Sequence, residues 1–196
     1  MSNLTYFIIA LAVFCLVYYV IPPAIDAYVK FRGKRVLICP ETRNPVGVDV
    51  DVKHAVSTAV FSRRPDLRLT RCSRWPERHD CEQDCVLQVR MAPADTLVRT
   101  ILNEFYKGKK CVFCGLSFGE VHLFDQKPAL LSPEGVTIEW EVVRPESLPG
   151  VLRTHKPVCW NCHIAETFRK EFGDLVVERS CAAAGAGAES RPRAQG

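Results

Sequence analysis

Two Cys-x-x-Cys pairs constrain this chain more than any other feature of its sequence. They are Cys111-Val-Phe-Cys114 and Cys159-Trp-Asn-Cys162. Two thiolates separated by two residues can point at one ion from a tight turn, and Zn²⁺ takes four tetrahedral ligands with sulfur at roughly 2.3 Å. Gly115, directly after the first pair, suits a turn that needs a left-handed backbone. The sequence therefore predicts one zinc site with four thiolate ligands.

The surroundings of the two pairs differ. The stretch 116–140 is strand-like and rich in turns. The second pair, in contrast, begins a run of good helix-forming residues that ends near Phe172. Cys162 should therefore lie in a first helical turn, where the helix dipole favours thiolate. A cysteine turn (the knuckle), a hairpin and a second pair that opens a helix resemble the treble-clef zinc-finger superfamily over residues 110–172.

That resemblance implies Cys111, Cys114, Cys159 and Cys162 as the ligands. Its spacer of residues 115–158 is longer than the usual 15–20 residues between such pairs. Four thiolates leave no open position for water, so we expect a structural zinc and no enzyme. The sequence also lacks a Walker loop, a dinucleotide glycine pattern, a His-Glu-x-x-His motif and a nucleophile elbow.

Two other chemistries are open for the second pair. Cys159, Cys162 and His163 satisfy the attachment pattern of a c-type haem, with His163 as the proximal ligand, which would make the chain an electron-transfer protein. A Cys-x-x-Cys near a helix N-terminus can also exchange disulfides, which would suit a thiol-based sensor of metal or redox state.

Four further cysteines form a second group. They could bind zinc or an iron–sulfur cluster, or they could be buried structural cysteines. His79 is a substitute ligand in the same stretch, and Cys81 and Cys85 share one face if that stretch is helical. The group is Cys39, Cys72, Cys81 and Cys85.

The N-terminal segment predicts a membrane anchor over residues 1–28. Residues 1–25 contain no Asp, Glu, Lys or Arg. About 20 apolar residues at 1.5 Å each cross the ~30 Å hydrocarbon core, so a helix from about Leu4 to Ile25 suffices. Pro22 and Pro23 should end or kink it.

Three other interpretations of this segment compete with an anchor. A cleaved signal peptide needs a positive start and small residues before the cut, and neither is present. Lipid attachment at Cys15 is disfavoured by the bulky Phe14 before it. A buried core helix is seldom this long and this apolar.

The charges that follow the anchor predict its orientation. Lys30, Arg32, Lys34 and Arg35 resist translocation, so the rest of the chain should lie in the cytoplasm at the inner membrane of the cell. Disulfides do not persist in a reducing compartment. Most of the ten cysteines should therefore be metal ligands.

Beyond the anchor the sequence predicts an α+β fold. The expected parts are a cysteine-containing subdomain over 34–108, a zinc-finger-like subdomain over 109–180 and a disordered tail over 181–196. Expected strands are 35–39, 46–51 and 67–72, and expected helices are 51–61, 93–106 and 159–172.

Function follows at the level of a class. We expect a zinc-binding adaptor, held at the lipid bilayer by its anchor, that binds a protein partner through the finger surface. Nucleic acid is not an expected partner, because acidic residues interleave with the basic stretch 63–78 and the formal net charge is only +4.

Overall fold

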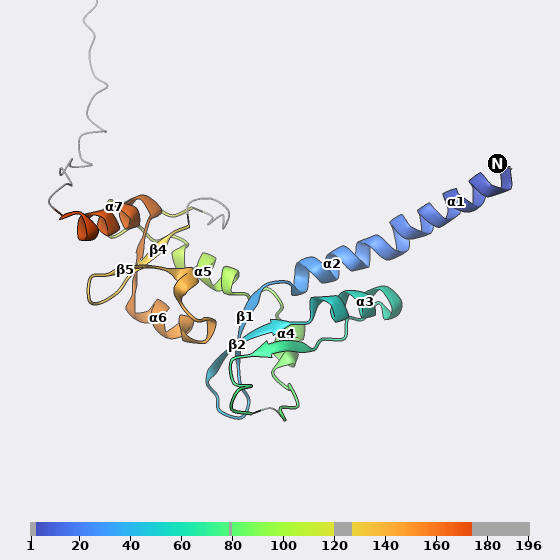
Figure 1. The fold of residues 1–196 in the computed structure, drawn as a ribbon, viewed down its shortest axis with the longest axis horizontal. Helices are drawn as coiled ribbons and strands as arrows, with labels where there is room; N and C mark the ends of the chain where they lie inside the picture. The colour runs from blue at the N-terminus through green and yellow to red at the C-terminus, as the bar shows by residue number, and fades with distance from the viewer. Residues whose placement is uncertain (1–2, 79, 120–126, 174–196) are drawn as a thin grey trace, which may run out of the picture. The chain divides into compact units, whose positions relative to one another are not determined.

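The computed structural model describes residues 3–78, 80–119 and 127–173 of the 196-residue chain. Helices and short sheets are mixed along it (Figure 1). The chain divides into two compact units: unit 1 is residues 1–105 with 141–154, and unit 2 is residues 106–140 with 155–196. The tail predicted to be disordered and His79 lie outside the described residues.

One continuous helix begins unit 1. It consists of α1 (Asn3–Cys15), a π-helical turn η1 (Leu16–Val20) and α2 (Ile21–Phe31). Its 29 residues are long and apolar enough to cross a membrane, with a mean hydropathy of 2.5 in the most apolar window. No residue of α1 is buried. The exposure of α1 distinguishes it from the core helix of a soluble protein.

Of the two outcomes expected at Pro22 and Pro23, an end or a kink of the helix, the end near Ile25 is wrong. The helix continues to Phe31 because the prolines occupy the first turn of α2. The N–H of Ile21, just before them, bonds the carbonyl of Leu16 in the π register. Proline is tolerated in a first turn, where its missing N–H removes no intrahelical bond.

The core of unit 1 is built on an antiparallel sheet of order β1-β2-β3. Its strands are β1 (Lys34–Ile38), β2 (Pro45–Val50) and β3 (Leu69–Cys72). In β2 the residues Val46, Val48 and Val50 are buried and those between them are half-buried, as their alternation predicts. Residue Asp51 caps helix α3 (Val52–Ser62) by accepting a 3.0 Å bond from the N–H of His54.

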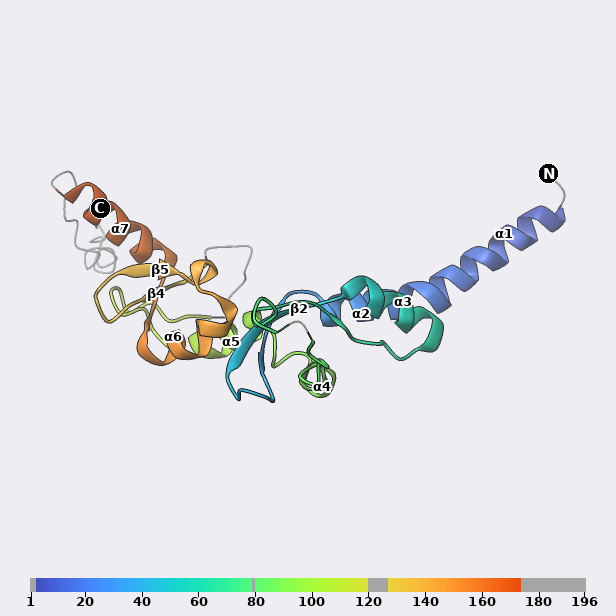
Figure 2. The same cartoon turned by 60° about the horizontal axis from the view of Figure 1, so that its bottom comes forward.

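The C-terminal end of the long helix belongs to this core. Helix α2 packs alongside α3 (Figures 1 and 2). Ala27 of α2 and Ala55 and Ala59 of α3 are buried, and residues this small let two helix backbones approach closely. Phe31 completes the cluster. The apolar helix is thus joined to unit 1 by packing as well as by chain connectivity.

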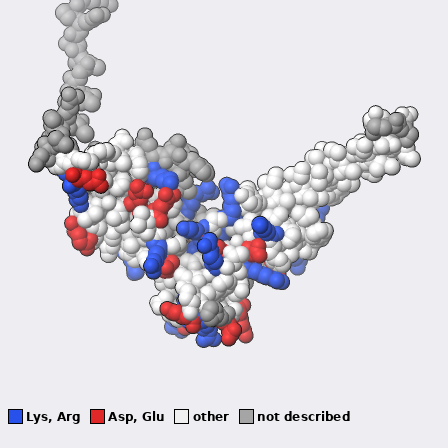
Figure 3. All heavy atoms as spheres, in the orientation of Figure 1, with Lys and Arg blue, Asp and Glu red and all other residues white. Residues whose placement is uncertain are grey.

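Arg35 is the most deeply buried charge of the unit. Its guanidinium donates to the Thr96 hydroxyl at 2.7 Å and to the carbonyls of Lys30 and Pro93. Burial lowers the pKa of Arg35 to about 10. Arg35 therefore ties the end of α2 to the segment before α5. The positive charges beside the helix that remain exposed are Lys30, Arg32 and Lys34. Figure 3 shows α1 free of charged side chains.

Shorter elements complete unit 1. They are α4 (Val86–Met91), α5 (Val98–Tyr106), η2 (Trp140–Val142), η3 (Pro145–Ser147) and α6 (Leu148–Thr154). The turn η3 packs on β2 at Gly47, where an added Cβ would lie 2.7 Å from a carboxylate oxygen of Glu146. An added Cβ would also lie 3.0 Å from Cβ of Pro145, so a larger residue at this position would require Pro145 and the Glu146 side chain to shift.

Unit 2 contains a second antiparallel sheet, of order β5-β4-β6. Strand β4 (Ala129–Leu131) lies between β5 (Thr137–Glu139) and β6 (Lys156–Val158), and α7 (Trp160–Glu171) follows β6. The stretch 116–140, expected to be strand-like, thus contains β4 and β5, whereas β6 and α6 were not predicted.

Candidate metal centre

The first cysteine pair lies in a tight hairpin turn. The N–H of Cys111 donates to the carbonyl of Leu116 at 2.8 Å, and the N–H of Gly115 donates to the carbonyl of Cys111 at 2.9 Å. Gly115 has φ +71°, the left-handed conformation expected for it. The knuckle, residues 109–118, is closed by antiparallel pairing of Lys110 with Ser117. Its backbone therefore fixes where the two thiols point.

The second pair lies where β6 passes into α7. Cys159 is the N-cap residue of the helix, and its backbone carbonyl accepts a 3.0 Å bond from the N–H of His163. Cys162 falls in the first helical turn, as predicted. Strand β6 also holds the knuckle, because the N–H of Val112 donates to the carbonyl of Pro157 at 3.1 Å. One strand thus positions both pairs.

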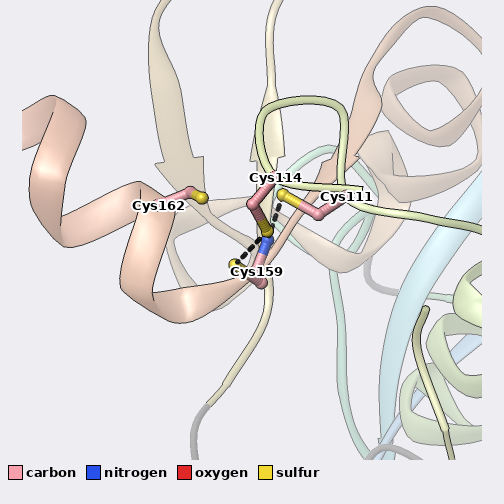
Figure 4. A group of neighbouring side chains, drawn as sticks. All are labelled: Cys111, Cys114, Cys159 and Cys162. Carbon is pink, nitrogen blue, oxygen red and sulfur yellow. Dashed lines mark hydrogen bonds between the residues drawn. The ribbon is translucent and has the colours of Figure 1, made fainter. Parts of the chain in front are cut away.

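The four sulfur atoms come together at this point. The Sγ atoms of Cys111, Cys114, Cys159 and Cys162 all lie within 4.8 Å of one another, and those of Cys114 and Cys159 are 3.6 Å apart. Figure 4 shows the two pairs approaching from the knuckle and from the start of α7. Four sulfurs bonded to one ion at 2.3 Å would be separated by roughly 3.8 Å. The cluster therefore has the dimensions of a site for a single metal ion.

Burial and backbone donors shape the protonation of these thiols. Burial and the neighbouring sulfurs raise the pKa of Cys162, and burial raises that of Cys159. Burial opposes ionisation of Cys111 too, but backbone N–H groups lower its pKa to about 7. The N–H of Cys159 donates to the Cys111 sulfur at 3.3 Å. A metal that binds all four thiolates must displace the protons that burial retains.

The proposed haem ligand His163 faces the sheet of its own unit. Its Nδ1 lies 2.9 Å from the Thr137 hydroxyl, and its Nε2 lies 3.7 Å from a carboxylate oxygen of Glu139. The ring packs beside Trp160 with centroids 5.5 Å apart. His163 is buried, and both ring nitrogens have neighbours in β5. Its place in the structure is to hold α7 against this strand.

The second group of cysteines also gathers, but less tightly. Cys39 follows β1, Cys72 ends β3, Cys81 lies in a loop and Cys85 precedes α4. All four line one cavity of about 310 Å³. In the described part of the chain, three or more ligand atoms within 4.8 Å of one another occur at the first group and not here.

Two thiols of this group, those of Cys85 and Cys39, have pKa values shifted in opposite directions. Burial and the neighbouring Cys72, Cys81 and Cys39 raise the pKa of Cys85 to about 11. Burial acts the same way on Cys39, but donors from Thr42, Glu41 and Arg74 lower its pKa to about 7.

The shared helical face expected for Cys81 and Cys85 is not present. Gln83, between them, has φ +61°, and α4 begins only at Val86. The nine cysteines of the described residues are all free thiols.

Comparison with protein families, with curated proteins and with solved structures finds no significant match to this chain. The character of the site is therefore argued from its own geometry.

We expect loss of one knuckle ligand to unfold unit 2. Because metal binding and folding are coupled, Cys111→Ser should lower the stability of unit 2 by at least about 3 kcal/mol, a fraction of the ~10–16 kcal/mol typical of structural zinc. The measurements are metal content and limited proteolysis of the full chain in detergent. Cys15→Ser, in exposed α1, is the matched control. Protection of unit 2 that persists in Cys111→Ser would contradict the expectation.

Proposed function

We propose that the chain is a membrane-anchored zinc protein that acts as an interaction module. The observation that carries the proposal is the approach of four cysteine sulfurs to within 4.8 Å of one another. A complete set of four thiolates is typical of structural zinc and leaves no coordination position for a reacting water. The proposed role of the ion is to hold a binding surface in shape.

The arrangement around the site supports a treble-clef-like finger. A knuckle supplies the first pair, β4 and β5 form a hairpin, and the second pair opens α7. The order of these parts along the chain is the order that the sequence resemblance implies. The long spacer is occupied in part by η3 and α6 of unit 1, which explains how 44 residues separate the pairs without enlarging the finger.

The same geometry favours zinc over the two alternative chemistries. A c-type haem at Cys159 and Cys162 would leave Cys111 and Cys114 without an ion, and its proximal ligand His163 is engaged with β5. A redox dithiol needs only two sulfurs, whereas four converge here. The dithiol alternative therefore gives no role to the first pair.

An apolar rim beside the metal centre supports the interaction role. Val112 and Phe113, between the two ligands of the knuckle, are 43% and 46% exposed, and Leu116 is 58% exposed. Apolar side chains gathered on one short turn mark a surface for a partner more often than scattered ones do. The backbone that presents them is the backbone that the metal fixes. Metal binding would therefore preorganise the surface.

Photo-crosslinking from position 113 tests this role. With a photoreactive phenylalanine analogue in place of Phe113, we expect a discrete crosslinked protein in intact cells. The same analogue at exposed Glu134, on the β4–β5 turn of unit 2, is the control and should give none. Crosslinks to lipid alone from position 113, or equal products at both positions, would contradict an adaptor role.

Membrane attachment and orientation complete the proposal. The exposed apolar surface of α1 and the exposed Lys30, Arg32 and Lys34 beyond it support a single span at the inner membrane, with unit 2 and the part of unit 1 after the helix in the cytoplasm. The packing of α2 on α3 would then place unit 1 directly against the lipid headgroups.

Reporter fusions test the orientation. A fluorescent protein fused after the last residue should fluoresce and remain with the membrane fraction, while alkaline phosphatase at the same position should be inactive. Deletion of residues 1–20 should release the fluorescent fusion from the membrane. Active phosphatase, or a mature protein that has lost its N-terminal helix, would overturn the orientation or the anchor respectively.

A further inference from the structure

Four cysteines of unit 1 that are distant in sequence surround one cavity. Cys39, Cys72, Cys81 and Cys85 come from two strand ends, a loop and the residue before α4. They line a space of about 310 Å³ together with Trp75 and other side chains. The space is partly open to solvent, and charged side chains such as Glu41 and Arg78 line it as well. Four cysteines that line one such space are placed to share a ligand there.

Two glutamines hold the loop 81–85 against the strands that carry the other cysteines. The side-chain carbonyl of Gln83 accepts a 2.8 Å bond from the N–H of Leu69, in β3. The amide of Gln88 bonds both backbone groups of Ile38, at 3.0 and 2.6 Å, at the end of β1. These side chains continue the hydrogen bonding of the sheet where no strand is present. The cavity is therefore a built feature of the fold.

The sulfurs receive hydrogen bonds suited to thiolates. Nη1 of Arg74 donates to the Cys39 sulfur at 2.9 Å and to Glu41 at 3.0 Å. The backbone N–H of Gln83 approaches the Cys81 sulfur at 3.4 Å. Hydrogen bonds of this kind stabilise sulfur ligands of metal clusters and tune their potentials. An arginine is also the charge that compensates an anionic thiolate centre.

The spacing of the sulfurs distinguishes this group from the centre in unit 2. In the cluster of unit 2, four sulfurs lie close enough to share one ion, but no three ligand atoms of the described second group lie within 4.8 Å of one another. In an iron–sulfur cluster the thiolates bind different irons, so they are held farther apart than the ligands of a single ion. A wider ring of four cysteines around a cavity fits a cluster better than a zinc ion.

We propose that Cys39, Cys72, Cys81 and Cys85 bind an iron–sulfur cluster in the cavity of unit 1. The chain then holds two thiolate centres of different kinds, a single ion in unit 2 and a cluster in unit 1. The cluster proposal is independent of the zinc centre, because the two centres share no ligand and lie in different units.

Metal analysis of the full chain tests the proposal. The protein is expressed with iron supplied and purified anaerobically in detergent without added metal. We expect about four irons and about four acid-labile sulfides per chain for a 4Fe–4S cluster, with a brown colour that bleaches on reduction. Cys81→Ser, at a half-buried ligand, should reduce iron and sulfide to background and leave zinc unchanged.

Two further variants complete the design. Cys114→Ser should remove zinc and leave iron and sulfide, and Cys15→Ser should change neither. Wild-type protein without iron would overturn the proposal, and two zinc ions per chain would show instead that the second group is a single-ion site. If the single variants Cys81→Ser and Cys72→Ser each retain iron at the wild-type level, the proposal is also overturned. The wild-type analysis decides the question even if a variant does not fold.

Discussion

The convergence of four sulfur atoms in unit 2 is the interaction on which the rest of that unit depends. One buried cluster of its described residues contains Cys111, Ala129, Val158 and Cys159, so half of that cluster is made of thiols, while Leu130 and Tyr106 are fully buried as well. Small domains commonly add a metal or a disulfide to a limited apolar core. Cys111 and Cys159 thus belong to the core of the unit as well as to its candidate site.

Unit 1 is organised differently. A conventional apolar cluster joins α2, the sheet and α3, and the buried Arg35 ties the end of the long helix to the segment before α5. Cys39 and Cys85 are buried members of that cluster, and the partly buried Cys72 packs against it. A unit with an apolar core of its own can hold cysteines around a cavity before any metal binds.

Local chemistry made much of this structure predictable. The spacing of the two Cys-x-x-Cys pairs identified the sulfurs that meet, because each pair is presented by a single turn. The buried alternation of β2 and the cap at Asp51 also arise from short-range patterns. The length of the apolar segment and its lack of charged residues likewise predicted one helix that could span a membrane.

Interactions between distant residues could not be read in the same way. Nothing near Arg35 in sequence indicates that it is buried, since its partner Thr96 is 61 residues away. The bonds of Gln83 and Gln88 to distant strands have no sequence pattern. The π-helical turn before the proline pair has none either. In each case tertiary hydrogen bonds or a shift of helical register overrode a correct local rule.

The most direct test of the central claim is the coordination of zinc in the purified full chain, measured by X-ray absorption. The account predicts four sulfur neighbours at about 2.3 Å and no nitrogen or oxygen in the first shell. A shell that contains nitrogen or oxygen, or protein that retains no zinc at all, would contradict it.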